Sequence, residues 1–288
     1  METLMPGRMP RAGLLLLPLL LCFVPETARS IDQVALKAIV DHVHQYRPVT
    51  APAPTDQYAV AISLPQSMCN SISPSELNEH LPVSELQAMK SKLETDLLYE
   101  GDHVVAAAKP NKHAESGTQY LHSEWLMFHL DQNGVSPVSR LLDKSRDQTK
   151  CQETRAFEES YGNNRYPRSF LNNPCGWNRC FVFFTYYSPC LGTCLSLKED
   201  HRIQDLMDGI FSAIDSDHRA LAFKEVFKKD RSLGKQIVWN SWQTLCKVPL
   251  YQCDDQGCQS CKEKDVNKNS CLTAVKNPAT KAPKIAHG

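Results

Sequence analysis

The spacing of apolar residues divides the chain into alternating helix-like and strand-like segments. Apolar residues recur at helical spacing in several stretches, whereas near-continuous apolar runs bounded by proline or polar loops are typical of strands. The predicted helices cover residues 31–46, 84–97, 139–149, 203–214 and 233–246. The predicted strands cover residues 58–64, 102–109, 180–187 and 220–227. This alternation predicts an α/β layered fold in which helices cover both faces of a sheet.

Local signals refine three of these boundaries. Ser73-Pro-Ser-Glu76 and Ser84-x-x-Gln87 both have the spacing of a capping box, which predicts helix starts at these serines. Residues 180–187 are almost wholly aromatic or apolar, which predicts a central strand covered on both faces. Ser188-Pro189 ends that strand, and we expect Cys190 to begin a helix.

The first thirty residues resemble a secretory signal peptide. Arg8 and Arg11 precede the apolar run 14–24, and Ala28-Arg29-Ser30 has a small-x-small cleavage pattern. A membrane anchor is the alternative, but Pro18 interrupts the run, and a spanning helix needs about 20 apolar residues. We therefore expect a secreted protein without a membrane segment, although no Asn-x-Ser/Thr sequon supports secretion.

Length and charge limit the remaining possibilities. We expect a signal peptide at 1–30, an N-terminal helix and linker at 31–55, a main domain at 56–245 and a Cys-rich extension with a basic tail at 246–288. The 32 basic residues are balanced by 32 acidic ones. This balance argues against a protein that grips nucleic acid by charge alone. The lysines of the tail are interpreted as a solvated segment.

The twelve cysteines suit an oxidising compartment, where most are expected to pair. Cys22 leaves with the signal peptide, so eleven remain, and an odd number requires a use other than simple pairing. Five of them form a second cluster: Cys246, Cys253, Cys258, Cys261 and Cys271. A structural zinc ribbon is one interpretation of this spacing, but no histidine joins the cluster, so we favour a disulfide-tied extension.

Two short motifs carry the candidate chemistry: His122-Ser-Glu124 and Pro189-Cys190-x-x-x-Cys194. On a helix, residues four apart share a face, so both sulfurs would point at a common centre. Taken alone, each cysteine is more simply a disulfide partner, and Glu124 a helix-start acid. His113-Ala-Glu115 is a competing motif, but only His122 is followed by an apolar helical run, 125–128.

Together these motifs resemble the cytidine deaminase superfamily, whose signature is H-x-E followed by P-C-x-x-C. Within it, the Tyr187-Ser188-Pro189-Cys190 context resembles the AID/APOBEC-like branch, with Tyr187 in place of a tryptophan common there. With the secretion signal and the cysteine-rich end, the chain is similar to the secreted novel AID/APOBEC-like deaminases of fish. The resemblance covers about residues 56–245 and implies a three-layer cytidine-deaminase-like fold, with a mixed central sheet, helices on both faces and a disulfide-rich C-terminal extension.

The resemblance also implies the chemistry of the site. It implies Zn²⁺ held by His122, Cys190 and Cys194, with Glu124 as the catalytic acid and base, and cytosine held near Ser188 and Tyr187. Two features depart from the pattern. The cysteines are separated by three residues rather than two, and the interval between His122 and Pro189 is long, which places an insertion at 131–175 beside the site.

Three functions remain open at this stage. The first is deamination of cytosine in single-stranded DNA or RNA, and the second is deamination of a free nucleoside. The third is a catalytically inactive secreted binding protein on a deaminase scaffold, which the intact motif residues disfavour. The sequence does not indicate an oligomeric state. Basic and aromatic residues occur together near the motif at Tyr161, Arg165, Tyr166, Arg168, Trp177 and Arg179.

Overall fold

The computed structural model describes residues 30–49, 57–108, 122–144, 178–196, 198 and 202–277. Within these ranges the chain forms a seven-stranded sheet of order β2-β3-β1-β4-β5-β6-β7. The strands are β1 (Tyr58–Pro65), β2 (Leu98–Glu100), β3 (Val104–Ala108), β4 (Arg179–Tyr187), β5 (Arg219–Glu225), β6 (Leu250–Asp254) and β7 (Gly257–Ser260). The β4–β5 and β5–β6 pairs are parallel, and the other neighbours are antiparallel. The sheet is therefore mixed, as expected.

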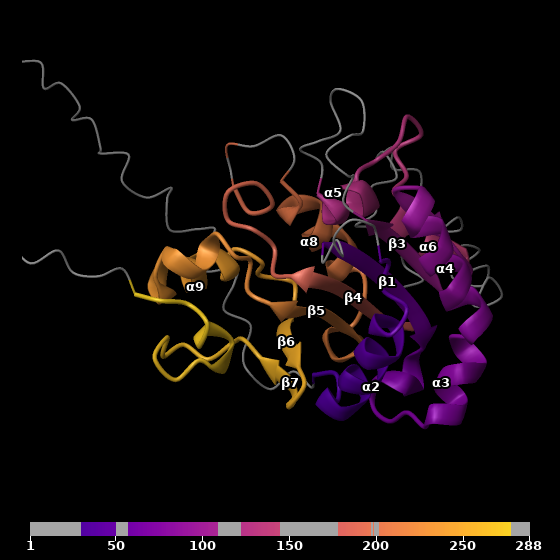
Figure 1. Cartoon of the computed structure of the whole chain (residues 1–288), viewed down its shortest axis with the longest axis horizontal. Coiled ribbons are helices and arrows are strands. Elements are labelled where there is room, and N and C mark those ends of the chain that lie inside the picture. Colours follow the sequence, from indigo (N-terminus) through magenta and orange to yellow (C-terminus); the bar gives the residue numbers. More distant parts are fainter. Residues whose placement is uncertain are drawn as a thin grey trace, which may run out of the picture.

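Helices cover both faces of this sheet (Figure 1). One face carries α2 (Gln33–His44), α3 (Pro74–His80) and α4 (Val83–Thr95), and the other carries α5 (Ser123–Phe128), α6 (Pro137–Lys144), α8 (Gln204–Ser212) and α9 (Lys235–Trp242). Short 3-10 turns lie at η1 (Gln66–Cys69), η4 (Ser216–His218), η5 (Asp230–Ser232) and η6 (Ser270–Leu272). The three-layer α/β architecture is confirmed.

The central strand β4 divides the two cores by simple alternation. Phe181 and Phe183 face the layer of α5 and α8, while Val182 and Phe184 face the layer of α2 and α4. All four side chains are fully buried. This matches the two-sided burial predicted from the aromatic run, because successive strand residues point to opposite faces.

Disulfides fix the ends of this framework. Cys69 in η1 is bonded to Cys180 at the start of β4, across 111 residues of sequence. In the C-terminal segment, Cys253 pairs with Cys258 across the β6–β7 hairpin, and Cys261 pairs with Cys271. Cys246 is also disulfide-bonded. The disulfide interpretation of the second cysteine cluster is confirmed, and part of that segment extends the sheet as β6 and β7.

Two local predictions are wrong. Ser73 and Glu76 form the expected capping box, but α4 begins at Val83 after Pro82, so Ser84 lies inside its first turn and caps nothing. The second error concerns Cys190, which begins no helix: residues 191–195 form a turn that Leu195 N closes onto the Cys190 carbonyl at 3.1 Å. That bond spans five residues, so the turn is wider than an α-helical one.

Several earlier predictions fall outside the described ranges. They concern almost the whole signal peptide, the competing His113 motif, and the aromatic and basic residues 161–177. None of the described helices has the length and apolar character that crossing a membrane requires.

Candidate metal centre and its surroundings

The candidate site lies where β4 ends and α5 begins. The parallel strands β4 and β5 end at the same edge of the sheet, with Ser188 N donating to the Glu225 carbonyl at 2.8 Å. Ligands of α/β proteins bind preferentially at the carboxyl ends of such strands. His122 is the residue immediately before α5, and Cys190 and Cys194 bracket the turn after β4.

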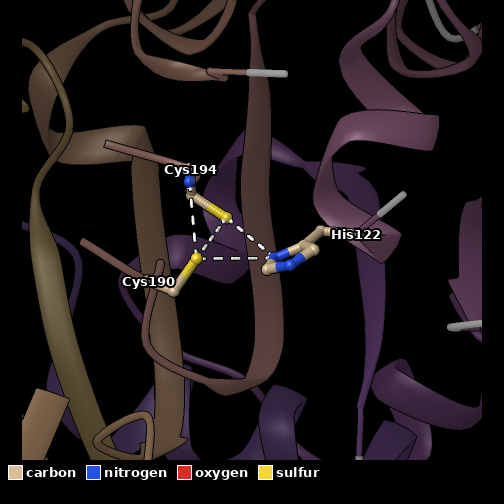
Figure 2. Close-up of side chains that lie close together, drawn as sticks. All are labelled: His122, Cys190 and Cys194. Atoms are coloured by element: carbon tan, nitrogen blue, oxygen red, sulfur yellow. Dashed lines mark hydrogen bonds between the residues drawn. The ribbon is translucent and has the colours of Figure 1, made fainter. Parts of the chain in front are cut away.

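The structure brings His122, Cys190 and Cys194 together (Figure 2). His122 Nδ1 lies 3.2 Å from Cys194 Sγ and 3.5 Å from Cys190 Sγ, and the two sulfurs are 3.4 Å apart. Both thiols are buried and free, whereas the other cysteines among the described residues are in disulfides. These three residues could hold a metal ion. The sulfurs converge although the expected helix is absent.

The contact between the two thiols shifts the pKa of each in opposite directions. The hydrogen bond between the two thiols lowers the pKa of the Cys190 thiol to about 4, with His122 adding to the effect. The same contact, together with burial, raises the pKa of Cys194. A lowered pKa favours the thiolate, which is the form that binds metals.

Glu124 lies beside this cluster on the first turn of α5 and is only 1% exposed. Thr185 Oγ1 donates to its Oε1 at 2.9 Å, and Ser123 Oγ donates to its Oε2 at 3.1 Å. Burial raises the pKa of the Glu124 carboxyl, while the nearby His122 opposes the rise. A buried carboxyl with a raised pKa next to a candidate metal site is typical of catalytic centres.

Tyr187 and Ser188 close the end of β4. Tyr187 is 6% exposed and packs edge-on against Phe227, with Lys228 Nζ 5.4 Å from its ring centre. Ser188 is buried, and its hydroxyl accepts a hydrogen bond from Phe227 N at 3.1 Å. The residues that follow β5 therefore lie directly beside the candidate site.

The sequence analysis did not predict the roles of Ser123, Thr185 and the segment 227–231, which contains Asp230. The role of Thr185 could have been predicted, because Thr185 points to the same face of the strand as Phe181 and Phe183, and a polar group on a buried face needs a hydrogen-bond partner. Asp230 had no such sequence signal. Its carboxylate is 3% exposed and accepts a hydrogen bond from Leu191 N at 3.1 Å, although the two residues are 39 positions apart.

The structure places Arg179, one member of the predicted basic and aromatic group, away from the candidate site. This residue begins β4 and donates to the Ser63 carbonyl and hydroxyl, so it holds neighbouring strands together. At about 3.3 Å per residue, the length of β4 separates it from Cys190 by roughly 30 Å. Among the described residues, Phe227, Lys228 and Lys229 follow β5 beside the site, and the two lysines are exposed.

A second group of possible metal ligands, Asp215, Asp217 and His218, lies elsewhere, next to η1. His218 Nδ1 is already 3.0 Å from the Gln66 amide and 3.1 Å from Asp217. These hydrogen-bonding contacts account for the placement of the group without a metal ion.

The comparison with family models agrees with the geometry. The model described as Secreted Novel AID/APOBEC-like Deaminase 1 matches residues 33–275. The chain belongs to this family of secreted deaminases. No curated protein and no solved structure matches the chain. For this member of the family, the matched range includes the candidate metal centre, Glu124 and the strands β6 and β7.

Proposed function

We propose that this family member is a zinc-dependent deaminase that hydrolyses the exocyclic amine of cytosine. In this proposal His122, Cys190 and Cys194 are the zinc ligands, and Glu124 is the catalytic acid and base. One observation carries the proposal: an imidazole nitrogen and two free sulfurs converge at the end of β4 beside a buried carboxylate.

The donor set fits zinc. Tetrahedral zinc with ordinary Zn–S and Zn–N bonds places two sulfurs about 3.8 Å apart and a sulfur and a nitrogen about 3.6 Å apart. The three separations here, 3.2, 3.4 and 3.5 Å, are close to these values. Nitrogen and thiolate ligands favour zinc over the harder cations, and three protein ligands leave a fourth position for water.

The proton chemistry falls to Glu124. Bound zinc would supply the Lewis acidity that ionises a water molecule near neutral pH. Glu124 would take one proton from that water and pass it to the ring nitrogen. It would then carry the proton of the newly added hydroxyl group to the amine, which leaves as ammonia. Thr185 and Ser123 hold its two oxygens in place, and burial raises the pKa of the carboxyl group, which favours proton uptake. Burying an acid costs folding free energy, which supports a catalytic role over an inert scaffold.

Cytosine would lie against the end of β4. Ser188 would offer its carbonyl oxygen or its O–H there, because its N–H donates to Glu225 and its hydroxyl oxygen accepts from Phe227 N. The ring of Tyr187 forms the adjacent wall, supported from behind by Phe227. These positions support the proposed roles of Ser188 and Tyr187 in holding the base.

The segment after β5 favours single-stranded nucleic acid over a free nucleoside. Lys228 and Lys229 are exposed next to Tyr187, where they can meet the phosphates flanking the target base. Positive charge concentrated beside the site compensates for the neutral charge of the whole chain.

The test compares deamination of cytidine with that of a cytosine-containing single-stranded DNA and RNA oligonucleotide. Lys228→Ala/Lys229→Ala should lower kcat/KM on the oligonucleotide at least about 10-fold at low salt, with cytidine turnover unchanged. The slope of log kcat/KM against log salt should fall by about 1.4, since each contact to a single strand contributes about 0.7. Lys262→Ala/Lys264→Ala, which removes two exposed lysines after β7, is the matched control. Turnover of neither substrate by the zinc-loaded protein would contradict the proposal, and turnover of cytidine alone would assign the nucleoside.

A further inference from the structure

The turn that carries the two cysteines lacks the internal support of a helix. Its internal hydrogen bonds are Leu195 N to the Cys190 carbonyl at 3.1 Å and Cys194 N to Cys190 Sγ at 3.4 Å. A helix would set the sulfur positions through its repeated backbone bonds, but this turn has no such series. Contacts from outside the turn must therefore fix where its two ends lie.

His122 contacts both sulfurs, and the backbone at each end of the turn is held by one further contact. At the far end, Ile203 N donates to the Cys194 carbonyl at 2.9 Å, which is a backbone bond. At the near end, Leu191 N donates to Asp230 Oδ2 at 3.1 Å. Asp230 is thus the side chain that anchors the turn beside Cys190.

Asp230 is itself rigidly placed. Its own N–H donates to the Phe227 carbonyl at 3.0 Å, and Phe227 N is tied to Ser188 at the end of β4. The next residue, Arg231, pairs with Glu225, and its carbonyl accepts Lys276 N at 2.8 Å from the C-terminal segment. Contacts with β4, β5 and the C-terminal segment therefore hold Asp230 in place beside the turn.

No ion pair accounts for the burial of this carboxylate. Among the described residues no cation lies within salt-bridge distance of Asp230, and Arg231 instead binds Glu225 and the Val226 carbonyl. A buried carboxylate without a counter-charge is costly unless hydrogen bonds compensate. The bond to Leu191 N is the contact through which Asp230 reaches the site.

We propose that Asp230 is a positioning residue for the metal centre, which holds Cys190 in the geometry needed to bind zinc by accepting the Leu191 N–H. This inference rests on the proposed function, because it assumes that Cys190 and Cys194 bind zinc. Partners that orient metal ligands contribute measurably to affinity, and their loss commonly weakens binding about 10- to 100-fold.

The test measures the zinc affinity of purified protein by competition with a chelator, and the visible absorption of the Co²⁺-substituted form. Asp230→Ala should weaken zinc binding about 10-fold or more and shift the sulfur-to-cobalt and ligand-field bands. Asp230→Asn keeps an oxygen that can accept the Leu191 N–H, so it should stay within about 3-fold of the original protein. Asp208→Ala is the matched control, because Asp208 is a half-buried aspartate that binds the backbone of Lys247 instead.

The outcomes separate the possible explanations. If Asp230→Ala binds zinc as tightly as Asp208→Ala and leaves the cobalt spectrum unchanged, the inference is wrong. If Asp230→Asn is as defective as Asp230→Ala, the effect arises from charge and the hydrogen-bond account is wrong. Asp230→Ser, too short to reach Leu191 yet polar, replaces Asp230→Ala if the alanine variant does not fold. Absence of metal from the unsubstituted protein would contradict the proposed function instead.

Discussion

Replacing Glu124 with glutamine removes the proposed proton carrier while preserving the shape of the side chain. In the structure Thr185 donates to one carboxylate oxygen and Ser123 to the other. The glutamine oxygen can still accept from Thr185, and its NH₂ group can donate to the Ser123 hydroxyl, which also accepts. We therefore expect Glu124→Gln to fold normally. Its melting temperature should equal or exceed that of the original protein, because a buried acid with a raised pKa is no longer present.

The activity should fall sharply. Loss of a positioned acid or base costs about 10²- to 10⁴-fold in rate. Glu124 is 1% exposed, so bulk water has little access to replace it, and we expect a value near the upper end. A 10³- to 10⁴-fold loss corresponds to about 4 to 5.5 kcal/mol of transition-state stabilisation.

The assay is deamination of oligonucleotide and cytidine at saturating substrate, with zinc content measured on the same samples. Glu85→Gln is the matched control, because Glu85 is a partly buried glutamate that is also hydrogen-bonded, but to the backbone of residues 102–104 on the other side of the sheet. If zinc-loaded Glu124→Gln turned over within about 10-fold of the original protein, Glu124 would not be the proton carrier. The assignment of the His-x-Glu motif would then fail.

Three further predictions concern the support of the site and the framework. Thr185→Val removes one hydrogen bond to Glu124, which is worth about 1 to 1.5 kcal/mol. We therefore expect kcat to fall about 10-fold at unchanged zinc content. An unaltered kcat would show that Thr185 does not position the acid. The Cys69–Cys180 disulfide closes a loop of 111 residues. Its removal by a double alanine substitution should lower the free energy of unfolding by about 3 to 5 kcal/mol in urea titrations. A loss under about 1 kcal/mol would contradict this account. Burial lowers the pKa of His44 from 6.5 to about 4, so between these pH values the unfolded chain binds more protons than the folded one. The free energy of unfolding should therefore fall by about 1 to 2 kcal/mol as the pH falls to about 4, after allowance for the partial exposure of the ring. His44→Gln should reduce that acid-dependent loss, and an identical pH profile would refute its origin in His44.

The parts of the fold that sequence predicted best are those set by strong local patterns. The strand at Arg179–Tyr187 and the helix at Gln33–His44 both have long, unambiguous apolar patterns, and both were predicted. The short strands β2, β6 and β7 were missed, because three to five residues with mixed polarity give no period to measure. Their strand geometry depends on pairing, of β2 with β3, of β6 with β5 and of β7 with β6, which a local pattern does not reveal.

The site divides in the same way. His122, Glu124, Cys190 and Cys194 were identified because they form two short motifs, and the structure brings the imidazole and both sulfurs together. The predicted helix at Cys190 was wrong because the i, i+4 spacing of the sulfurs is compatible with a wider turn. Gly192 and Thr193 are weak helix formers. In addition, the Leu191 N–H donates a hydrogen bond to Asp230, which lies 39 residues further along the chain. Such a contact has no local sequence signal.

The central claim is tested most directly by X-ray absorption spectroscopy at the zinc edge on the purified chain. We predict about one zinc per chain with two sulfur ligands at about 2.3 Å and nitrogen or oxygen ligands at about 2.0 to 2.1 Å. Cys194→Ser should remove one sulfur from that shell. A protein without bound zinc whose Cys190 and Cys194 are joined in a disulfide, or a zinc shell unchanged by Cys194→Ser, would contradict the account.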